Sequence, residues 1–284
     1  MIDLKNVTYK IKEDIDSLVY SEKISIENLS KCTKISKATL ESISDGNPVD
    51  NSVCEKFYSY VYEGGYRLNL VKEEFLKETD KTVLFHGSKF GLTTVDVAGS
   101  RKNCDFGQGF YLGETFESTV SLVCENEDSC VYSFEINMDG LNVIRFGCTL
   151  EWMLAICYFR GRIKEYESSQ IIRELIEKIN AADIIVAPIA DNRMFYIMSL
   201  FSDGDINHNV AIHSLSASSF GNQYVIKTEK ALKQIKCIEK YYVCAAERRH
   251  YINQLDQRTY SIDTKLKLAK RKYTEGKYIE EIFK

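Results

Sequence analysis

The sequence predicts an α+β protein that has one large core and a smaller helical module at each end. Its 284 residues are 44% apolar with only 2 prolines, which is enough apolar material for a sizeable core. Helical spacing of apolar residues dominates up to about residue 79 and again after residue 245, whereas apolar runs typical of strands begin at Thr82. These observations predict modules of residues 1–79, 80–245 and 246–284.

The composition excludes several classes of protein. The apolar fraction is too high for a disordered chain, and no run of about 18 uncharged apolar residues occurs, so no membrane-spanning helix is expected. The first residues, MIDLKNVTYKIKEDID, are charged throughout and lack the apolar segment of a signal peptide. We therefore expect a cytoplasmic protein.

The 9 cysteines favour reduced side chains over a disulfide framework. They never form the CxxC spacing, their number is odd, and several lie in apolar runs such as LAICYF and YYVCAA. No metal site is predicted, although a zinc site built from Cys124, Cys130 and one of the 4 histidines stays open.

The amino-terminal module, residues 1–79, has the pattern of several short helices. Ser25 is the predicted N-cap of a helix from Ile26 to about Cys32, and Ser36 caps a helix that runs through Ile43. The apolar contacts between these two helices are expected from Leu29, Ile35, Leu40 and Ile43. Residues 64–80 follow as a charged connector.

This pattern resembles the helix-turn-helix domain of phage repressors. In that class the third helix enters the major groove, which implies DNA contacts by Ser36, Lys37, Thr39 and Glu41. The charge opposes this, because affinity for DNA comes mainly from neutralised phosphates and residues 1–79 hold 11 basic and 14 acidic side chains (11 − 14 = −3). A module used for protein contacts stays open beside a DNA-binding one.

The central module begins with a strand and a histidine. From Thr82 the chain reads TVLFHGS, which places His86 at the end of a predicted strand. The later segment DFGQGFYL brings Gly107 and Gly109 before an aromatic strand that contains Tyr111. Two glycines there indicate that the backbone bends sharply or that another segment lies close against it. Because this GxG precedes a strand and not a helix, it is not a phosphate-binding loop.

Later segments of the central module complete its core. Residues 149–178 have a helical pattern, and Trp152 and Met153 in the run LEWMLAICYF are expected in the core. The segment ADIIVAPIADNRMF predicts a buried strand, a turn and a helix. Arg193 in that turn is either a fork-like donor to a phosphate or a surface arginine beside a helix cap.

Four segments in this order resemble the ADP-ribosyltransferase superfamily: LFHGS, DFGQGFYL, ADIIVAPIADNRMF and NQYVIKTEKALKQIK. That superfamily cleaves NAD and includes diphtheria-type toxins and poly(ADP-ribose) polymerases. The chain looks more closely similar to a bacterial family of ADP-ribosyltransferase-like proteins that also carry glutamine in the last of these segments. The resemblance covers residues 81–245 and implies the split β-sheet fold of the superfamily.

The resemblance also implies a set of site residues, with NAD as substrate. His86 would hydrogen-bond the adenosine-side ribose, the backbone of Gly87 would hold the nicotinamide amide, and Tyr111 would stack on the nicotinamide ring. Gln223 matches the position where many relatives carry a glutamate that contacts the ribose under attack. The implied catalytic residues are His86, Tyr111 and Gln223, and the implied cofactor contacts are His86, Gly87, Ser88, Gly109, Phe110, Tyr111 and Arg193. Such residue types suit a reaction that needs orientation and stacking more than a strong nucleophile.

Gln223 differs from glutamate in a property that limits the reaction. A glutamine can orient a ribose hydroxyl, but it cannot take a proton as a general base. Elongation of an ADP-ribose chain is therefore not expected, whereas transfer of a single ADP-ribose or hydrolysis of NAD is. If a base is needed, the candidates are Glu229, Asp191 and Asp105, or the acceptor itself is reactive, and the choice among these alternatives stays open.

The tail, residues 246–284, is basic, whereas the whole chain has a net charge of −4. Residues 245–284 hold 10 basic and 6 acidic side chains (10 − 6 = +4). The spacing predicts one or two solvated helices that pack Tyr251, Leu255, Leu266 and Leu268. Contact with nucleic acid is the alternative role for this tail.

Together these features predict a mono-ADP-ribosyltransferase, a bacterial toxin or effector that transfers ADP-ribose from NAD to a protein or nucleic acid. An antitoxin or other regulatory protein is the expected partner. The alternative is a DNA-binding regulator whose central module senses NAD without turnover. A third hypothesis, a structural interaction protein, would bind no NAD.

Overall fold

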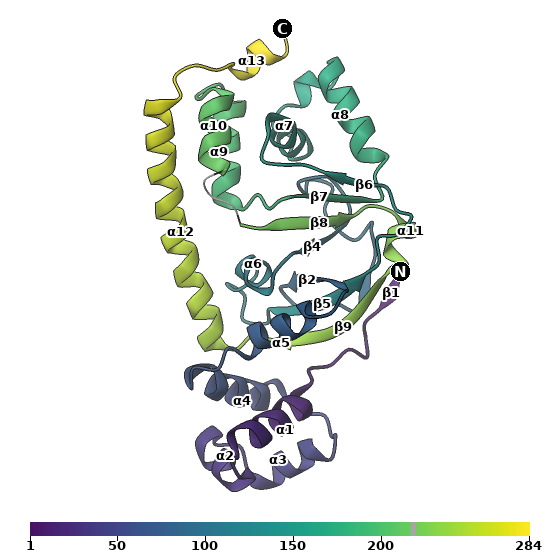
Figure 1. Cartoon of the computed structure of the whole chain (residues 1–284), viewed down its shortest axis with the longest axis vertical. Helices are drawn as coiled ribbons and strands as arrows, with labels where there is room; N and C mark the ends of the chain where they lie inside the picture. Colours follow the sequence, from purple (N-terminus) through teal and green to yellow (C-terminus); the bar gives the residue numbers. More distant parts are fainter. Residues whose placement is uncertain (217–219) are drawn as a thin grey trace.

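The computed structural model describes residues 1–216 and 220–284 and centres on a seven-stranded sheet (Figure 1). The strand order is β6-β7-β8-β4-β2-β5-β9, and every neighbouring pair is antiparallel except β6 with β7. The strands are β2 (Thr82–Ser88), β4 (Phe110–Gly113), β5 (Cys130–Ile136), β6 (Val143–Arg145), β7 (Ile184–Pro188), β8 (Asn222–Ile226) and β9 (Ile235–Tyr242). Since helices pack around this sheet, the predicted α+β class is confirmed.

The sheet is weakly joined between β2 and β4. β2 pairs with β5 along its whole length, from Thr82 to Ser88, but with β4 only through Phe85 and Gly113. Beyond that single pair the two strands diverge. The divergence begins at the residues that sequence analysis singled out, because His86 follows Phe85 and Tyr111 precedes Gly113 by two positions.

β2 is buried on both faces because its side chains alternate between two cores. Val83 and Phe85 pack with Phe116 of α6 (Phe116–Ser121) and Tyr251 of α12 (Ala245–Lys272). Leu84 packs on the opposite face with residues of β4 and β5. This two-sided burial fixes the register of β2 and with it the position of His86.

Another core lies over β7 and β8, beneath helices that follow β6 in the sequence. Trp152 and Met153 are fully buried there, so their predicted place in the core is confirmed. The surrounding helices are α7 (Leu150–Phe159), α8 (Gln170–Asn180), α9 (Asn192–Ser202) and α10 (His208–Ser216). The shorter elements are η1 (Lys164–Tyr166), α11 (Glu229–Leu232) and α13 (Ile279–Ile282).

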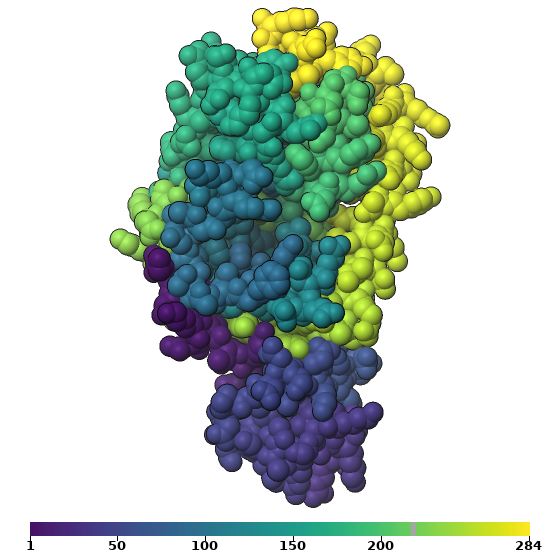
Figure 2. Space-filling view, turned by 180° about the vertical axis from the view of Figure 1, so that it is seen from behind, coloured from purple at the N-terminus to yellow at the C-terminus, as the bar shows by residue number. Residues whose placement is uncertain are grey.

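Four amino-terminal helices form a lobe at one end of the molecule, purple in Figures 1 and 2. They are α1 (Ile11–Glu22), α2 (Ile26–Thr33), α3 (Lys37–Ser44) and α4 (Asn51–Glu63). The side chain of Ser25 accepts a hydrogen bond from Asn28 N, and that of Ser36 from Thr39 N, so both predicted N-caps are confirmed. The predicted contacts are confirmed as well, because the lobe buries Leu29, Ile35, Leu40 and Ile43.

Two segments of residues 1–79 lie against the sheet and not in this lobe. β1 (Ile2–Asp3) pairs with β3 (Thr94–Val95), and Leu4 is buried in the core beside the sheet. α5 (Leu68–Lys77) packs beside β2 and α6. Its buried Asn69 donates hydrogen bonds to Tyr242 O (3.0 Å) and to Glu247 (2.9 Å). The connector predicted for residues 64–80 is therefore tied to the sheet by buried polar contacts.

The tail contributes one long helix, α12, which runs along the side of the molecule from the amino-terminal lobe to α10 (Figure 1). Tyr251 and Leu266 are buried as expected. The expectation for Leu268 was wrong: it is 58% exposed, because a residue two positions after Leu266 on a helix points to a different side. Among the described residues, no helix has both the length and the apolar character needed to cross a membrane.

Candidate functional site

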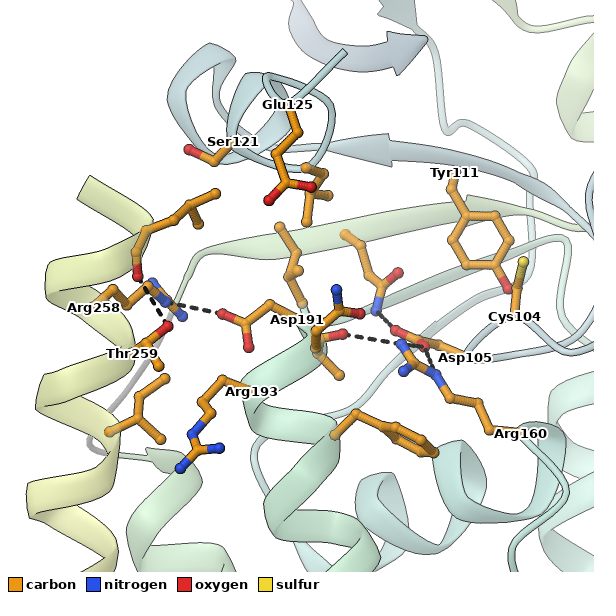
Figure 3. Close-up of a pocket in the computed structure, with 18 of the residues that line it drawn as sticks. Cys104, Asp105, Tyr111, Ser121, Glu125, Arg160, Asp191, Arg193, Arg258 and Thr259 are labelled. Carbon is orange, nitrogen blue, oxygen red and sulfur yellow. Dashed lines mark hydrogen bonds and ion pairs between the residues drawn. The ribbon is translucent and has the colours of Figure 1, made fainter. Parts of the chain in front are cut away.

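A cavity of about 720 Å³ lies between the sheet and α12, and we call it the main cavity (Figure 3). Its walls come from β4, β8, the end of α6, the start of α9 and the middle of α12. Its polar and aromatic lining includes Lys89, Arg101, Asp105, Tyr111, Glu125, Arg160, Asp191, Arg193, Gln223, Asp256 and Arg258. Its volume falls in the range of about 300–1,000 Å³ that is usual for small-molecule sites.

A smaller cavity of about 150 Å³, the inner cavity, adjoins the main one at the divergence of β2 and β4. His86 and Gly87 line the inner cavity, and Tyr111 and Gln223 line both. The three residues predicted as catalytic, His86, Tyr111 and Gln223, therefore meet at one place although they come from three strands. The strand pairing explains this, because β4 lies between β2 and β8.

His86 lines the inner cavity with a neutral imidazole ring. Its Nδ1 lies 2.7 Å from the carbonyl oxygen of Tyr111, and since a carbonyl only accepts, Nδ1 carries the proton. Burial lowers the pKa of the imidazole, which keeps the ring neutral and leaves Nε2 with a lone pair. Phe110 stacks on the ring at 4.6 Å and fixes its plane.

Tyr111 is held at its hydroxyl by the loop of residues 105–109. The hydroxyl donates to Gly107 O at 2.6 Å and accepts from Phe106 N at 3.1 Å. Burial raises the pKa of this phenol above its ordinary value, so the group stays protonated and can make both bonds. The ring is therefore fixed before any ligand enters.

Gln223 is 7% exposed and is bound to two groups that only accept hydrogen bonds. Its Nε2 donates to Asp105 Oδ2 at 2.8 Å and to Pro188 O at 3.2 Å. Asp105 is held in turn by Arg160, whose Nε lies 2.7 Å from Oδ1 (Figure 3). Oε1 of Gln223 has no hydrogen-bond donor among the described residues, and it is the atom left for a ligand.

The loop of residues 105–109 is clamped by Lys227, which follows β8. Its Nζ donates to Phe106 O and to Gln108 O, both at 2.6 Å, and burial lowers the pKa of its ammonium to about 8. Both predicted uses of the glycines are confirmed. Gly107 bends the backbone at φ +73°, and a Cβ on Gly109 would lie 2.7 Å from Val225 of β8.

The charges that line the main cavity divide into paired and unpaired groups. Asp105 pairs with Arg160, and Asp191 pairs with Arg258 of α12 at 3.0 Å. Arg193 pairs with Asp263, also on α12. No ion pair within the described part of the chain involves the other charged lining residues, Lys89, Arg101, Glu125 and Asp256. Two cations and two carboxylates are thus available to a ligand.

Three of the predicted cofactor contacts line neither cavity. The Ser88 hydroxyl donates to Gly91 O at 2.9 Å, and Gly109 N donates to Ser100 Oγ at 3.0 Å. Phe110 is buried behind His86. The cofactor contacts predicted for these three residues therefore stay predictions, and the contacts they make in the structure are with the protein itself.

The candidate bases separate in the same way. Asp105 and Asp191 line the main cavity, but each has both carboxylate oxygens engaged: Asp105 by Arg160 and Gln223, Asp191 by Met194 N and Arg258. Glu229 lies on α11 beside the amino-terminal nitrogen, outside both cavities. Glu125, which was not a candidate, reaches into the cavity from the segment after α6 (Figure 3).

The residues predicted to contact DNA lie on and before α3, in the amino-terminal lobe. Ser36 Oγ lies 2.7 Å from Thr39 Oγ1, so the two hydroxyls are bonded to each other. Lys37 is exposed, but its Nζ lies 3.2 Å from Glu27 and 3.8 Å from Glu41. The positive charge of α3 is thus largely balanced by acidic neighbours.

The cysteines form no disulfide and suggest no metal centre. All 9 are free, and burial raises the pKa of both Cys124 and Cys130. Across residues 1–216 and 220–284, no cluster of three or more His, Cys, Asp or Glu side chains is placed to bind a metal ion. The zinc hypothesis for Cys124 and Cys130 therefore gains no support from the geometry.

Arg160, Lys227 and Arg258 are residues of this site that sequence analysis missed. Each lies at the end of a buried strand or helix or inside a charged tail, where a cation ordinarily faces solvent. Their roles depend on contacts with residues that are 55, 121 and 67 positions away. No local pattern carries that information.

Comparison with protein families gives one match. The model of the family described as "Protein of unknown function (DUF3990)" matches residues 82–237, which is more than half of the chain. The match begins at β2 and ends within β9, so it contains His86, Tyr111 and Gln223. Comparison with curated proteins and with solved structures gave no match.

Proposed function

The chain belongs to the DUF3990 family, and from the geometry of its cavities we propose that it is an NAD-dependent mono-ADP-ribosyltransferase. One observation carries this proposal: His86, Tyr111 and Gln223, from three different strands, all line the inner cavity. The weak junction of β2 and β4, where this space opens, supports a split-sheet ADP-ribosyltransferase fold. A metal ion has no part in the proposed reaction.

The inner cavity would hold nicotinamide. The ring of Tyr111 would form one wall for stacking, and the backbone of Gly87, which lines the same cavity, would hold the amide of the ligand. Gly87 has to be glycine because a Cβ there would lie 2.9 Å from Thr119 O of α6. The lone pair of His86 Nε2 accepts a ribose hydroxyl, which requires the neutral ring that burial favours.

The main cavity would hold the rest of NAD. Lys89 and Arg101 are the lining cations without an ion pair among the described residues, so they suit the pyrophosphate best. Arg193, the phosphate ligand expected from the sequence, also lines the cavity, but Asp263 already neutralises it. We assign it a secondary part in phosphate binding.

The transfer step breaks the bond between the ribose C1′ and the nicotinamide nitrogen, and the electron pair of that bond neutralises the pyridinium. An acceptor oxygen or nitrogen then bonds to C1′ and loses a proton. Gln223 orients the ribose but cannot take this proton. Glu125 takes it, because its carboxylate faces the cavity and, among the described residues, no cation or donor occupies it.

In this proposal the protein is a toxin or effector that modifies a macromolecule and is restrained by a partner protein. A second function is favoured by the amino-terminal lobe, where two capped helices joined by a short turn have the helix-turn-helix arrangement. In that case the protein is a DNA-binding regulator and its cavity binds NAD without turnover.

The test is the release of nicotinamide from labelled NAD by the full chain, together with transfer of label to lysate macromolecules. Tyr111→Ala should abolish both, because it removes the stacking wall of the inner cavity. Tyr20→Ala is the matched control, since Tyr20 is 88% exposed in the amino-terminal lobe. Saturable binding of NAD with no release would favour the regulator, and no binding would contradict both functions.

A separate variant tests the proposed base. Glu125→Gln keeps the size of the side chain but cannot accept a proton, so transfer should fall by about 10²-fold or more. The affinity for NAD should change little, because Glu125 is assigned to the acceptor and not to NAD. Equal transfer by the variant and the wild type would remove Glu125 from the mechanism.

A further inference from the structure

We propose that Asp105 is a positioning residue that makes glutamine, and not glutamate, the side chain required at position 223. This inference rests on the proposed function for its catalytic consequence, but its physical basis can be tested without NAD. The carboxylate of Asp105 faces the amide of Gln223 across 2.8 Å, in a place where each residue is 7% exposed. Nothing in the family match or in the sequence pattern assigns a part to this hydrogen bond.

The orientation of the Gln223 amide follows from its two partners. Asp105 Oδ2 and Pro188 O can only accept hydrogen bonds, so the nitrogen must face both of them. A turn of the amide by 180° would bring Oε1 against these two oxygens and remove both bonds. Oε1 is consequently held away from them, as an acceptor for a ribose hydroxyl in the cavity.

Asp105 is able to impose this orientation because it is itself held by Arg160. Arg160 Nε lies 2.7 Å from its Oδ1, and the Nη2 of the same arginine donates to Ala190 O at 3.1 Å. The guanidinium also lies 4.2 Å from the ring centroid of Phe195 on α9. The order of contacts is therefore Phe195, Arg160, Asp105 and Gln223, ending at the free Oε1.

A glutamate at position 223 would conflict with this arrangement. One of its carboxylate oxygens would take the place of Nε2, 2.8 Å from the carboxylate of Asp105 in a site largely shielded from water. Two adjacent carboxylates cannot both stay ionised there without strong repulsion, so one would have to bind a proton or move away. The substitution that would ordinarily supply a general base thus damages this site.

The experiment compares Gln223→Glu, Asp105→Asn and the double variant, with and without NAD. In the double variant the hydrogen bond is reversed, because the new amide at position 105 donates to the new carboxylate at position 223, and the total charge is that of the wild type. We expect each single variant to lower the rate of nicotinamide release by about tenfold or more, and the double variant to recover part of it, because the hydrogen bond to Pro188 O is not restored. The decrease should lie in kcat more than in KM, since orientation and not affinity is changed.

Thermal unfolding provides the readout that does not depend on catalysis. The midpoint for Gln223→Glu should fall at pH 7 and recover toward pH 4, where a carboxyl of the pair binds a proton, and the double variant should not show this recovery. The control is Gln170→Glu: Gln170 also donates to a carboxylate, Glu174 at 2.7 Å, but at an exposed site where the repulsion is screened. That control should shift the midpoint little at either pH.

The outcomes separate the two proposals. Strictly additive effects of the two substitutions, in unfolding and in turnover alike, would overturn the role of Asp105. If Gln223→Glu does not fold at pH 7, the test depends on Asp105→Asn alone. An unchanged kcat in Asp105→Asn would then overturn the role of Asp105. A third outcome is that the two substitutions have non-additive effects on the unfolding midpoint but the wild-type protein never releases nicotinamide. That outcome would support the role of Asp105 in orienting Gln223 and would contradict the proposed enzymatic activity.

Discussion

At the scale of single residues, the functional atoms are set by the hydrogen bonds of their neighbours. His86 presents an unprotonated Nε2 because Nδ1 is bound to a carbonyl, and Gln223 presents Oε1 because Nε2 is bound to two acceptors. The hydroxyl of Tyr111 is fully used within its own loop, so its ring is what remains for a ligand. The roles of His86 and Gln223 follow because their partners are oxygens that can only accept hydrogen bonds.

Buried titratable side chains make the free energy of unfolding depend on pH, and Glu247 is the clearest case. Burial raises its pKa from 4.5 to about 8, so between these pH values the native state holds a proton that the unfolded state has released. Its contribution to stability is therefore full below about pH 4.5 and disappears as the pH rises through about 8.

Glu247→Gln should remove this dependence. Between about pH 4.5 and pH 8 we expect the free energy of unfolding of the wild type to fall relative to that of the variant. The total fall should be roughly 1.4 kcal/mol for each unit by which burial raises the pKa of Glu247. The amide oxygen of the variant can still accept the hydrogen bond from Asn69 that Glu247 accepts at 2.9 Å. Urea unfolding at pH 5, 7 and 9 measures this, with the exposed Glu63→Gln as control. Parallel pH curves for wild type and Glu247→Gln would contradict the account.

At this scale, His86, Tyr111 and Gln223 are predicted through the resemblance, and the structure brings them together. The resemblance also implies cofactor contacts by Ser88, Gly109 and Phe110, although these residues line neither the main nor the inner cavity. Successive side chains of a strand point to opposite faces of the sheet. A residue next to a site residue in the sequence can therefore lie away from the ligand.

At the scale of elements, the site depends on the loop of residues 105–109, which links Tyr111 to Asp105. Lys227→Met removes the donor of two 2.6 Å hydrogen bonds and leaves the carbonyls of Phe106 and Gln108 without it. The free energy of unfolding should fall by about 1–3 kcal/mol. Nicotinamide release should fall as well, because the hydroxyl anchor of Tyr111 moves with the loop.

Lys233→Met is the matched control for this prediction. Lys233 is exposed, follows α11 and lines neither cavity, so stability and turnover should stay within experimental error. Equal effects of the two substitutions would show that removal of any lysine, and not removal of the clamp, changes the protein.

α12 is the second element on which the cavity depends. Ile262 is 1% exposed and lines the main cavity, so Ile262→Ala should lower the free energy of unfolding by about 2–5 kcal/mol. Leu268→Ala, further along the same helix and 58% exposed, should cost less than about 0.5 kcal/mol. Chemical denaturation measures both, and a large cost at Leu268 would contradict the orientation of the helix.

The elements differ in how far the sequence predicts them. The helices α2 and α3 are predicted nearly to the residue, because their caps and apolar spacing are local signals. The burial of α5 and the pairing of β1 with β3 are not, because both depend on partners that are distant along the chain. α12 is predicted as a helix, but its place as a cavity wall depends on ion pairs with α9 and the residue before it.

At the scale of the whole molecule, the two candidate surfaces for nucleic acid, the end of α12 and α3, differ in unpaired positive charge. The last turns of α12 carry Lys267, Lys270 and Arg271, which are exposed and have no ion pair within the described residues. Lys37 of α3, by contrast, has two acidic neighbours. Electrostatics therefore favours the end of α12 over α3 as a phosphate-binding surface.

The corresponding prediction compares charge reversals at the two surfaces. The double variant Lys267→Glu, Lys270→Glu should weaken any binding of the full chain to duplex DNA. The slope of log K against log salt concentration should also become shallower, by about 1 for each phosphate contact that is lost. Lys37→Glu should change affinity less. Fluorescence anisotropy over a salt series measures this, and a larger effect at Lys37 would instead support the helix-turn-helix mode of binding.

The proposed function requires NAD to bind with its nicotinamide in the inner cavity. The most direct measurement is a crystal structure of the full chain with a carbocyclic NAD analogue, which cannot release nicotinamide. We expect density for the nicotinamide ring against Tyr111 and Gly87, with a ribose hydroxyl on Oε1 of Gln223 and the phosphates toward Lys89 and Arg101. Density for the analogue at any other place, or none at saturating concentration, would contradict it.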